Sequence, residues 1–116
     1  AKTVYEIIKE SQKAGLKSVR PQKTCASVDD ACRKIIDYNN FGQYFIHSTG
    51  HGIGLDVHEN PNISSKNKEK LKKNMAITVE PGIYIPKKFG VRIEDSLIVK
   101  DRAAVMHKFT KDLIII

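Results

Sequence analysis

The sequence lacks several features that would assign the chain to a class at once. It contains no tryptophan, two cysteines and four prolines. No apolar run approaches the roughly 18 residues that a membrane span needs, so we expect no membrane association. No basic segment followed by an apolar one stands at the start, which predicts no secretory signal. Because the first residue is Ala1, we expect a processed chain, an excised domain or a fragment.

The two cysteines do not form a recognisable metal or redox motif. Cys25 and Cys32 are seven residues apart, and that spacing fits no common pattern. Cys32 falls on the apolar side of a predicted helix, which indicates a small core residue. Without a disulfide framework, a reducing environment is the default, so we expect a cytoplasmic protein.

The charge is strongly positive but scattered. Twenty basic and 13 acidic residues give a formal net charge of +7. Such a balance can serve nucleic-acid binding. However, the lysine run at 66–73 is interrupted by Glu69, and no aromatic residues alternate with the lysines as stacking platforms would require. We therefore expect a solvated basic surface and no nucleic-acid partner; salt-dependent binding to duplex DNA or RNA would reverse this expectation.

Residue periodicity predicts an α+β domain of 116 residues, long enough to bury a core. Apolar residues at three- and four-residue spacing predict a helix over 3–19 and a second one that begins at Ser27 as N-cap and ends at 39–42. Beyond residue 44 the pattern favours strands, and together these elements predict two helices packed on a mostly antiparallel sheet. We expect strands at 53–57, 75–79, 83–85, 91–99 and 103–108, a turn at 101–102, an apolar run at 113–116, and a loop at 61–74 with one helical turn at 66–71.

The segment 47–54 contains two histidines among small residues. Glycines flank His51 and allow another backbone to approach closely. A lone histidine is most often a satisfied core or surface group. The two flanking glycines and the nearby His47 and His58 favour a functional role for His51 instead. His107 on a late strand is interpreted as structural.

Two glutamates follow or interrupt apolar, β-branched runs. Glu80 can be a strand-end charge that faces water. Strict alternation places Glu94 on one face with Arg92 and Ser96, where it can simply pair with Arg92 on the solvent side. On adjacent strands, however, two carboxylates together hold a divalent cation that neither holds alone. Oxygen ligands with one imidazole suit Mn, Co, Fe or Zn.

Four linked motifs resemble the pita-bread metallopeptidases, the family of methionine aminopeptidase, aminopeptidase P and Xaa-Pro dipeptidase (prolidase). Their order and spacing also match, and Arg92 two residues before Glu94 resembles the proline-specific branch rather than methionine aminopeptidase. The matching residues are His47 and the run Gly50-His51-Gly52-Ile53-Gly54, then Val57-His58-Glu59 with Pro61, then Met75 and the run Thr78-Val79-Glu80-Pro81-Gly82-Ile83-Tyr84, and finally Gly90-Val91-Arg92-Ile93-Glu94-Asp95.

This resemblance implies a metal-dependent peptidase that hydrolyses the peptide bond before proline. It implies that His51, Glu80 and Glu94 are metal ligands in a site for two divalent ions, Mn or Co, which lower the pKa of a bridging water. By the same likeness His47 and His58 contact substrate and steady the transition state, and Arg92 supports the site. Glu80 is then also the general base.

The family site has two further ligands, aspartates on strands that precede this region, and the sequence does not supply them. We therefore expect residues 1–116 to be a partial domain, the second half of a pita-bread fold. Such a half-site predicts one weakly held ion or none, and little activity alone. The partners expected are a Xaa-Pro peptide or dipeptide, the missing amino-terminal half, or another copy of the chain. The alternative is a non-catalytic pita-bread-like binding or scaffold module.

Overall fold

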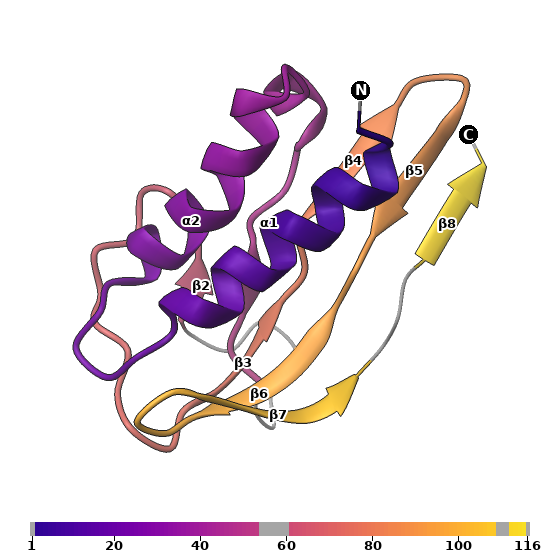
Figure 1. The fold of residues 1–116 in the computed structure, drawn as a ribbon. Helices are drawn as coiled ribbons and strands as arrows, with labels where there is room; N and C mark the ends of the chain where they lie inside the picture. The colour runs from indigo at the N-terminus through magenta and orange to yellow at the C-terminus, as the bar shows by residue number, and fades with distance from the viewer. Residues whose placement is uncertain (1, 54–60, 109–111, 116) are drawn as a thin grey trace.

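Two helices and a set of antiparallel strands make up the fold, as the sequence predicted (Figure 1). The structure, a computed structural model, describes residues 2–53, 61–108 and 112–115. Helices α1 (Val4–Ser18) and α2 (Cys25–Tyr38) are followed by the short 3-10 helix η1 (Gly42–Tyr44). The strands are β1 (Gly50–His51), β2 (Asn62–Ile63), β3 (Ala76–Val79), β4 (Gly82–Ile85), β5 (Phe89–Arg92), β6 (Asp95–Val99), β7 (Ala103–Lys108) and β8 (Asp112–Ile115).

The two helices are capped at their first turns by threonines. Thr3 and Glu6 form a capping box on α1. On α2 the N-cap is Thr24, whose Oγ1 accepts a hydrogen bond from the Ser27 amide at 3.1 Å. The prediction that Ser27 is the N-cap was therefore wrong. Ser27 instead lies in the first turn and donates its hydroxyl to the Thr24 carbonyl at 2.7 Å.

The loop before β3 contains no helical turn at 66–71, contrary to expectation. Its carbonyls instead accept the first amides of α2, Cys25 N to Glu69 O at 2.8 Å and Ala26 N to Asn67 O at 2.7 Å. Those amides have no partner inside their own helix, so the loop satisfies them by staying extended. Most of the predicted strand at 53–57 lies outside the described residues.

The central strands form one long antiparallel ribbon with an interruption. Strand β3 pairs with β6, and β4 pairs with β5, in a register that continues from one pair to the other. The predicted strand at 91–99 is therefore two strands, because β5 ends at Arg92 and β6 starts at Asp95. The predicted alternation holds across the break, with Val91, Ile93 and Asp95 buried and the residues between them half-buried.

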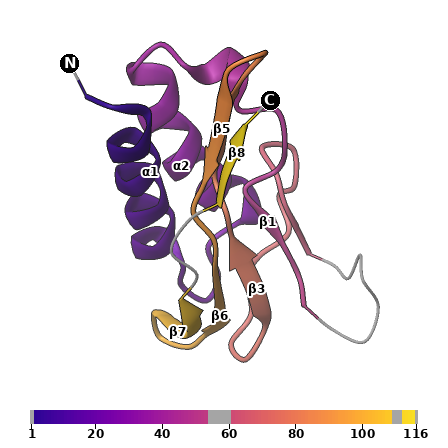
Figure 2. The ribbon, with the colours of Figure 1, turned by 90° about the vertical axis from the view of Figure 1, so that its right-hand side faces the viewer.

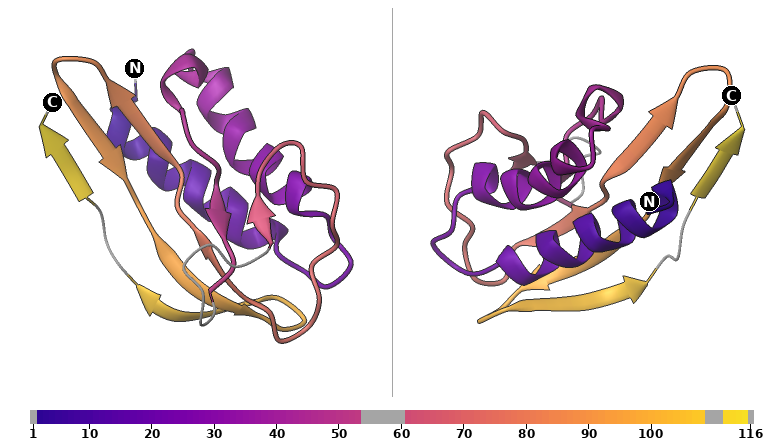
Figure 3. Two further views of the ribbon diagram at one scale, coloured as in Figure 1. Left: turned by 180° about the vertical axis from the view of Figure 1, so that it is seen from behind. Right: turned by 45° about the horizontal axis from the view of Figure 1, so that its top comes forward.

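Both helices lie on one side of the strands (Figure 2), and the strands come to the front when the molecule is seen from behind (Figure 3, left). Strand β8 lies beside β5, and β7 is at the end of the order β3-β6-β7. The core between helices and strands contains Ile7, Ile8, Val28, Cys32, Ile36, Ile77, Val79, Ile83, Leu97 and Val99. Within the described residues, no helix is long and apolar enough to cross a membrane.

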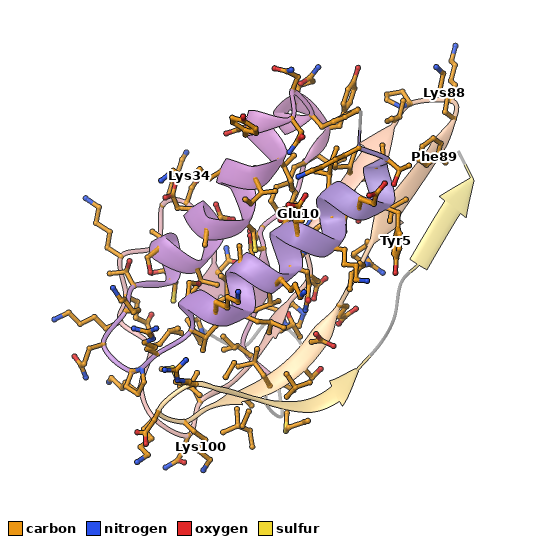
Figure 4. The ribbon with its side chains drawn as sticks, in the orientation of Figure 1. Tyr5, Glu10, Lys34, Lys88, Phe89 and Lys100 are labelled. Carbon is orange, nitrogen blue, oxygen red and sulfur yellow. The ribbon has the colours of Figure 1, made fainter. Side chains whose placement is uncertain are left out.

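Basic side chains emerge from separate parts of the molecule (Figure 4). Lys34 projects from α2, Lys88 from the tip of the β4–β5 hairpin and Lys100 from the turn after β6. These three lysines therefore do not form one continuous basic patch.

Candidate active site

The segment that carries His51 lies against β3, on the side opposite β6. Three hydrogen bonds fix it there, Glu80 N to Thr49 O at 2.6 Å, Ile53 N to Ala76 O at 2.9 Å and His51 N to Thr78 Oγ1 at 3.1 Å. A Cβ on Gly50 would overlap the Thr78 carbonyl oxygen. Glycine at position 50 is therefore what allows the close approach that brings His51 beside Glu80.

Glu80 and Glu94 occupy opposed positions in the ribbon. Val79 pairs with Asp95 before the interruption and Gly82 pairs with Arg92 after it, so the unbroken register places the two glutamates across from each other. Like charges directly opposite on neighbouring strands are destabilising. The arrangement therefore needs a positive charge nearby.

In its neutral form, His51 directs its unprotonated ring nitrogen toward Glu80. Its Nδ1 lies 2.8 Å from the Gly52 carbonyl, and a carbonyl can only accept, so Nδ1 carries the ring proton of the neutral imidazole. Nε2 then presents a lone pair 3.4 Å from Glu80 Oε2. That oxygen is buried and accepts no hydrogen bond from the described residues. Two acceptors thus face each other, and a proton or a metal ion between them would satisfy both.

The electrostatics of Glu94 agree with this picture. Burial raises the pKa of the Glu94 carboxyl, and the negative charge of Glu80 raises it further, while Arg92 and His51 partly offset the rise. The cause is the usual one for two carboxylates that share a partly buried site. Glu94 shares a face with Arg92, as the alternation predicted, and because the residue is half-buried the alternative of a simple solvent-facing position is not favoured.

His47 is held by both of its ring nitrogens. Nδ1 donates to the Ser48 carbonyl at 2.7 Å, which leaves Nε2 to accept the Tyr84 hydroxyl at 2.8 Å. The Tyr84 ring lies flat over the sheet because Gly82 and Gly90 leave room for it; a Cβ on Gly90 would stand 2.5 Å from Tyr84 Cδ1. The sequence motif contains Tyr84 without indicating its role, and the two glycines around its ring were the available signal.

Four of the expected site residues line one cleft of about 370 Å³. These are His47, His51, Glu80 and Arg92, with Ser48, Gly50 and Asn62 completing the wall. His58 lies outside the described residues. Within the described ranges, no three histidine, cysteine, aspartate or glutamate side chains are grouped as a metal site. Of the expected ligands, His51 lies beside Glu80, and Glu80 lies opposite Glu94 in the ribbon.

Comparison with known proteins places this chain in a family. The profile of metallopeptidase family M24 matches residues 1–101. The chain is 48% identical to the Xaa-Pro dipeptidase of Pyrococcus furiosus over 101 residues, which cover 87% of this chain and 29% of that protein.

Solved structures of similar peptidases agree with this family assignment. The Xaa-Pro dipeptidase from Bacillus anthracis is similar at 44% identity and a TM-score of 0.89, with 97% of this chain and 32% of that chain covered. The X-Pro aminopeptidase from Thermotoga maritima is similar at 37% identity and a TM-score of 0.88, with the same coverage of 97% and 32%.

The chain thus spans less than a third of the length of these relatives. The resemblance to the proline-specific branch and the pita-bread fold is confirmed by these matches. On the family profile, and on its likeness to dipeptidases and aminopeptidases named for Xaa-Pro substrates, the chain belongs to metallopeptidase family M24.

Proposed function

We propose that this chain is part of a divalent-metal-dependent peptidase that cleaves the peptide bond before proline. We further propose that His51, Glu80 and Glu94 are three of its metal ligands. The observation that carries the proposal is the contact at 3.4 Å between two acceptors, His51 Nε2 and the buried Glu80 Oε2, which accepts no hydrogen bond from the described part of the chain. One imidazole and two carboxylates form a donor set that suits Mn²⁺ or Co²⁺.

Each residue has a defined task in this reaction. A divalent ion, when bound, supplies Lewis acidity that makes hydroxide available near neutral pH. Glu80 takes the proton of the attacking water and delivers it to the proline nitrogen as the peptide bond breaks. His47, which lines the cleft and accepts the Tyr84 hydroxyl at Nε2, contacts the substrate, and His58 assists it. Arg92 moderates the charge of Glu94.

We also propose that residues 1–116 are the second half of the catalytic domain and that the two remaining ligands come from elsewhere in the protein. The coverage of less than a third of each relative's length supports this view. Three ligands hold one ion weakly, so the isolated chain is expected to have little or no peptidase activity. The alternative of a scaffold without catalysis is less well supported, because a scaffold has no use for an imidazole nitrogen that faces a buried carboxylate oxygen.

Calorimetric titration of the metal-free chain with Mn²⁺ and with Co²⁺ tests the proposal. We expect one weak site per chain that is lost in Glu80→Gln. The control is Glu69→Gln, the same change on an exposed loop residue, which should bind as the wild type does. Equal binding by Glu80→Gln and wild type would refute the ligand assignment. Measurable turnover of a Xaa-Pro dipeptide by the pure chain would refute the incomplete half-site.

A further inference from the structure

A buried carboxylate on α2 lies behind the site and has no part in the chemistry described above. Asp29 is 0% exposed. Its Oδ1 accepts from Thr49 Oγ1 at 2.8 Å, from the Thr49 amide at 3.3 Å and from Arg33 Nη2 at 3.1 Å, and its Oδ2 accepts from Arg33 Nε at 2.9 Å. A fully buried charge persists only when it is paired and hydrogen-bonded in this way.

Arg33 carries the connection from Asp29 to the segment before His51. Its Nη1 donates to the Phe45 carbonyl at 3.1 Å and its Nη2 to the His47 carbonyl at 3.2 Å. The guanidinium also stacks 4.1 Å from the centre of the Phe45 ring, and that ring meets the His47 imidazole edge-on at 5.2 Å. Arg33 therefore restrains both the backbone and the ring of His47.

Thr49 carries a second connection. While its amide and hydroxyl bind Asp29, its carbonyl accepts the Glu80 amide at 2.6 Å. One carboxylate on a helix is thus linked within two residues to His47 and to Glu80, which come from different parts of the chain. The planar guanidinium suits this task, because it offers several donors in a fixed geometry that a lysine cannot reproduce.

We propose that Asp29 and Arg33 are positioning residues, an ion pair between a buried carboxylate and a half-buried guanidinium that sets the placement of His47 and Glu80. Their role in the reaction rests on the proposed function, but the placement itself does not. A buried ion pair is weak evidence for stability, because well-packed apolar residues often replace one at no cost. The role of the pair follows instead from its hydrogen-bond partners. Arg33 binds the Phe45 and His47 carbonyls, and Asp29 binds Thr49, whose carbonyl accepts the Glu80 amide.

Nitrogen NMR of the histidine rings in the metal-free chain tests the placement, at a pH above the usual histidine pKa. In the wild type His47 should show one tautomer, with the proton on Nδ1; its signals are assigned by their loss in His47→Gln. In Arg33→Lys and Thr49→Val we expect a mixture of tautomers and a shifted Glu80 amide signal. Thr49→Ser, which keeps the hydroxyl, should restore both.

Lys34→Arg is the matched control, because it exchanges the same residue types at the neighbouring exposed position and should change neither signal. Wild-type signals in folded Arg33→Lys and Thr49→Val would overturn the proposal. Unfolding of both variants would also overturn it, because the pair would then act on stability.

A Mn²⁺ titration of the same samples separates this inference from the proposed function. If the wild type binds Mn²⁺, Arg33→Lys should bind it about tenfold more weakly, as is usual when support behind a ligand is lost. If the wild type binds no Mn²⁺, the ligand assignment fails, while the tautomer of His47 still decides whether the ion pair sets the geometry.

Discussion

The ionisation of Glu94 reports most directly the electrostatic cost of placing two carboxylates in one partly buried site. Its raised pKa means that, above the ordinary value of 4.5, the folded metal-free chain binds a proton more tightly than the unfolded chain does. The free energy of unfolding therefore falls as pH rises through the window between 4.5 and the raised value. Above the raised pKa the charged Glu94 costs stability, which a bound cation would recover.

Glu94→Gln should accordingly stabilise the metal-free chain at neutral pH. Removing the charge relieves its repulsion from Glu80, and we expect the thermal midpoint to rise by about 2 °C, a small shift because the side chain is only half-buried. Circular dichroism melts in the presence of a chelator measure this. The gain should vanish in acid, where both variants are neutral. Glu69→Gln, the same change at an exposed loop position, serves as the control. A lower thermal midpoint for Glu94→Gln than for the wild type at neutral pH would contradict the repulsion between Glu80 and Glu94.

Cysteine reactivity gives a second prediction for single residues. Burial raises the pKa of the Cys25 thiol to about 11 and that of Cys32 to about 12. Because the thiolate is the reactive form, both cysteines should react slowly with a disulfide reagent at neutral pH and rapidly after unfolding in urea. Fast labelling of either cysteine in the native chain would show that the helix–sheet core is open.

Among the elements, the contact between the two helices depends on Gly15. A Cβ there would overlap Cys32 Sγ and stand 3.0 Å from Val79 Cγ1. In an ordinary helix interior, glycine to alanine gains about 1 kcal/mol. Here Gly15→Ala should instead lower the free energy of unfolding by about 1–3 kcal/mol, because the overlap separates α1 from α2. Urea unfolding measures this change.

The matched test combines Gly15→Ala with Cys32→Ala, which removes the sulfur that the new Cβ would overlap. In that background Gly15→Ala should cost less than it does alone, so the two changes are not additive. Additive losses would mean that α1 and α2 are packed less closely than the structure shows.

For the whole molecule, we expect the sheet edge at β7 to govern association. Among the described strands β7 pairs only with β6, and its Val105 and Met106 are 37% and 50% exposed. Exposed apolar residues on an edge strand favour pairing with another chain, and a lysine there opposes it. We predict that the chain self-associates and that Met106→Lys weakens this association.

Sedimentation velocity over a range of concentrations measures the effect. Tyr38→Lys is the control, because Tyr38 is also exposed and apolar, at 85%, but lies at the end of α2. A chain that stays monomeric at high concentration, or an equal effect of both substitutions, would contradict the assignment of this edge.

Some of the fold and of the site could be predicted, because apolar spacing and alternation are patterns between residues close together in the sequence. Apolar spacing fixed the two helices, and alternation placed Arg92 and Glu94 on one face even though the strand breaks there. The position of the α2 cap could not be predicted reliably, since Thr24 and Ser27 are both acceptable N-cap residues. The choice of Thr24 depends on a distant loop, whose carbonyls at Asn67 and Glu69 take the first helix amides.

The sequence by itself determined the residue types of the site, because histidines, glutamates and glycines stand at motif spacing along the chain. The tertiary structure alone decided how they meet. The opposition of Glu80 to Glu94 follows from strand register, and the approach of His51 to Glu80 follows from the packing of Gly50 on Thr78. The link from Asp29 to Thr49 joins a helix to the site across 20 residues. Such contacts arise from long-range pairing, which local sequence patterns do not encode.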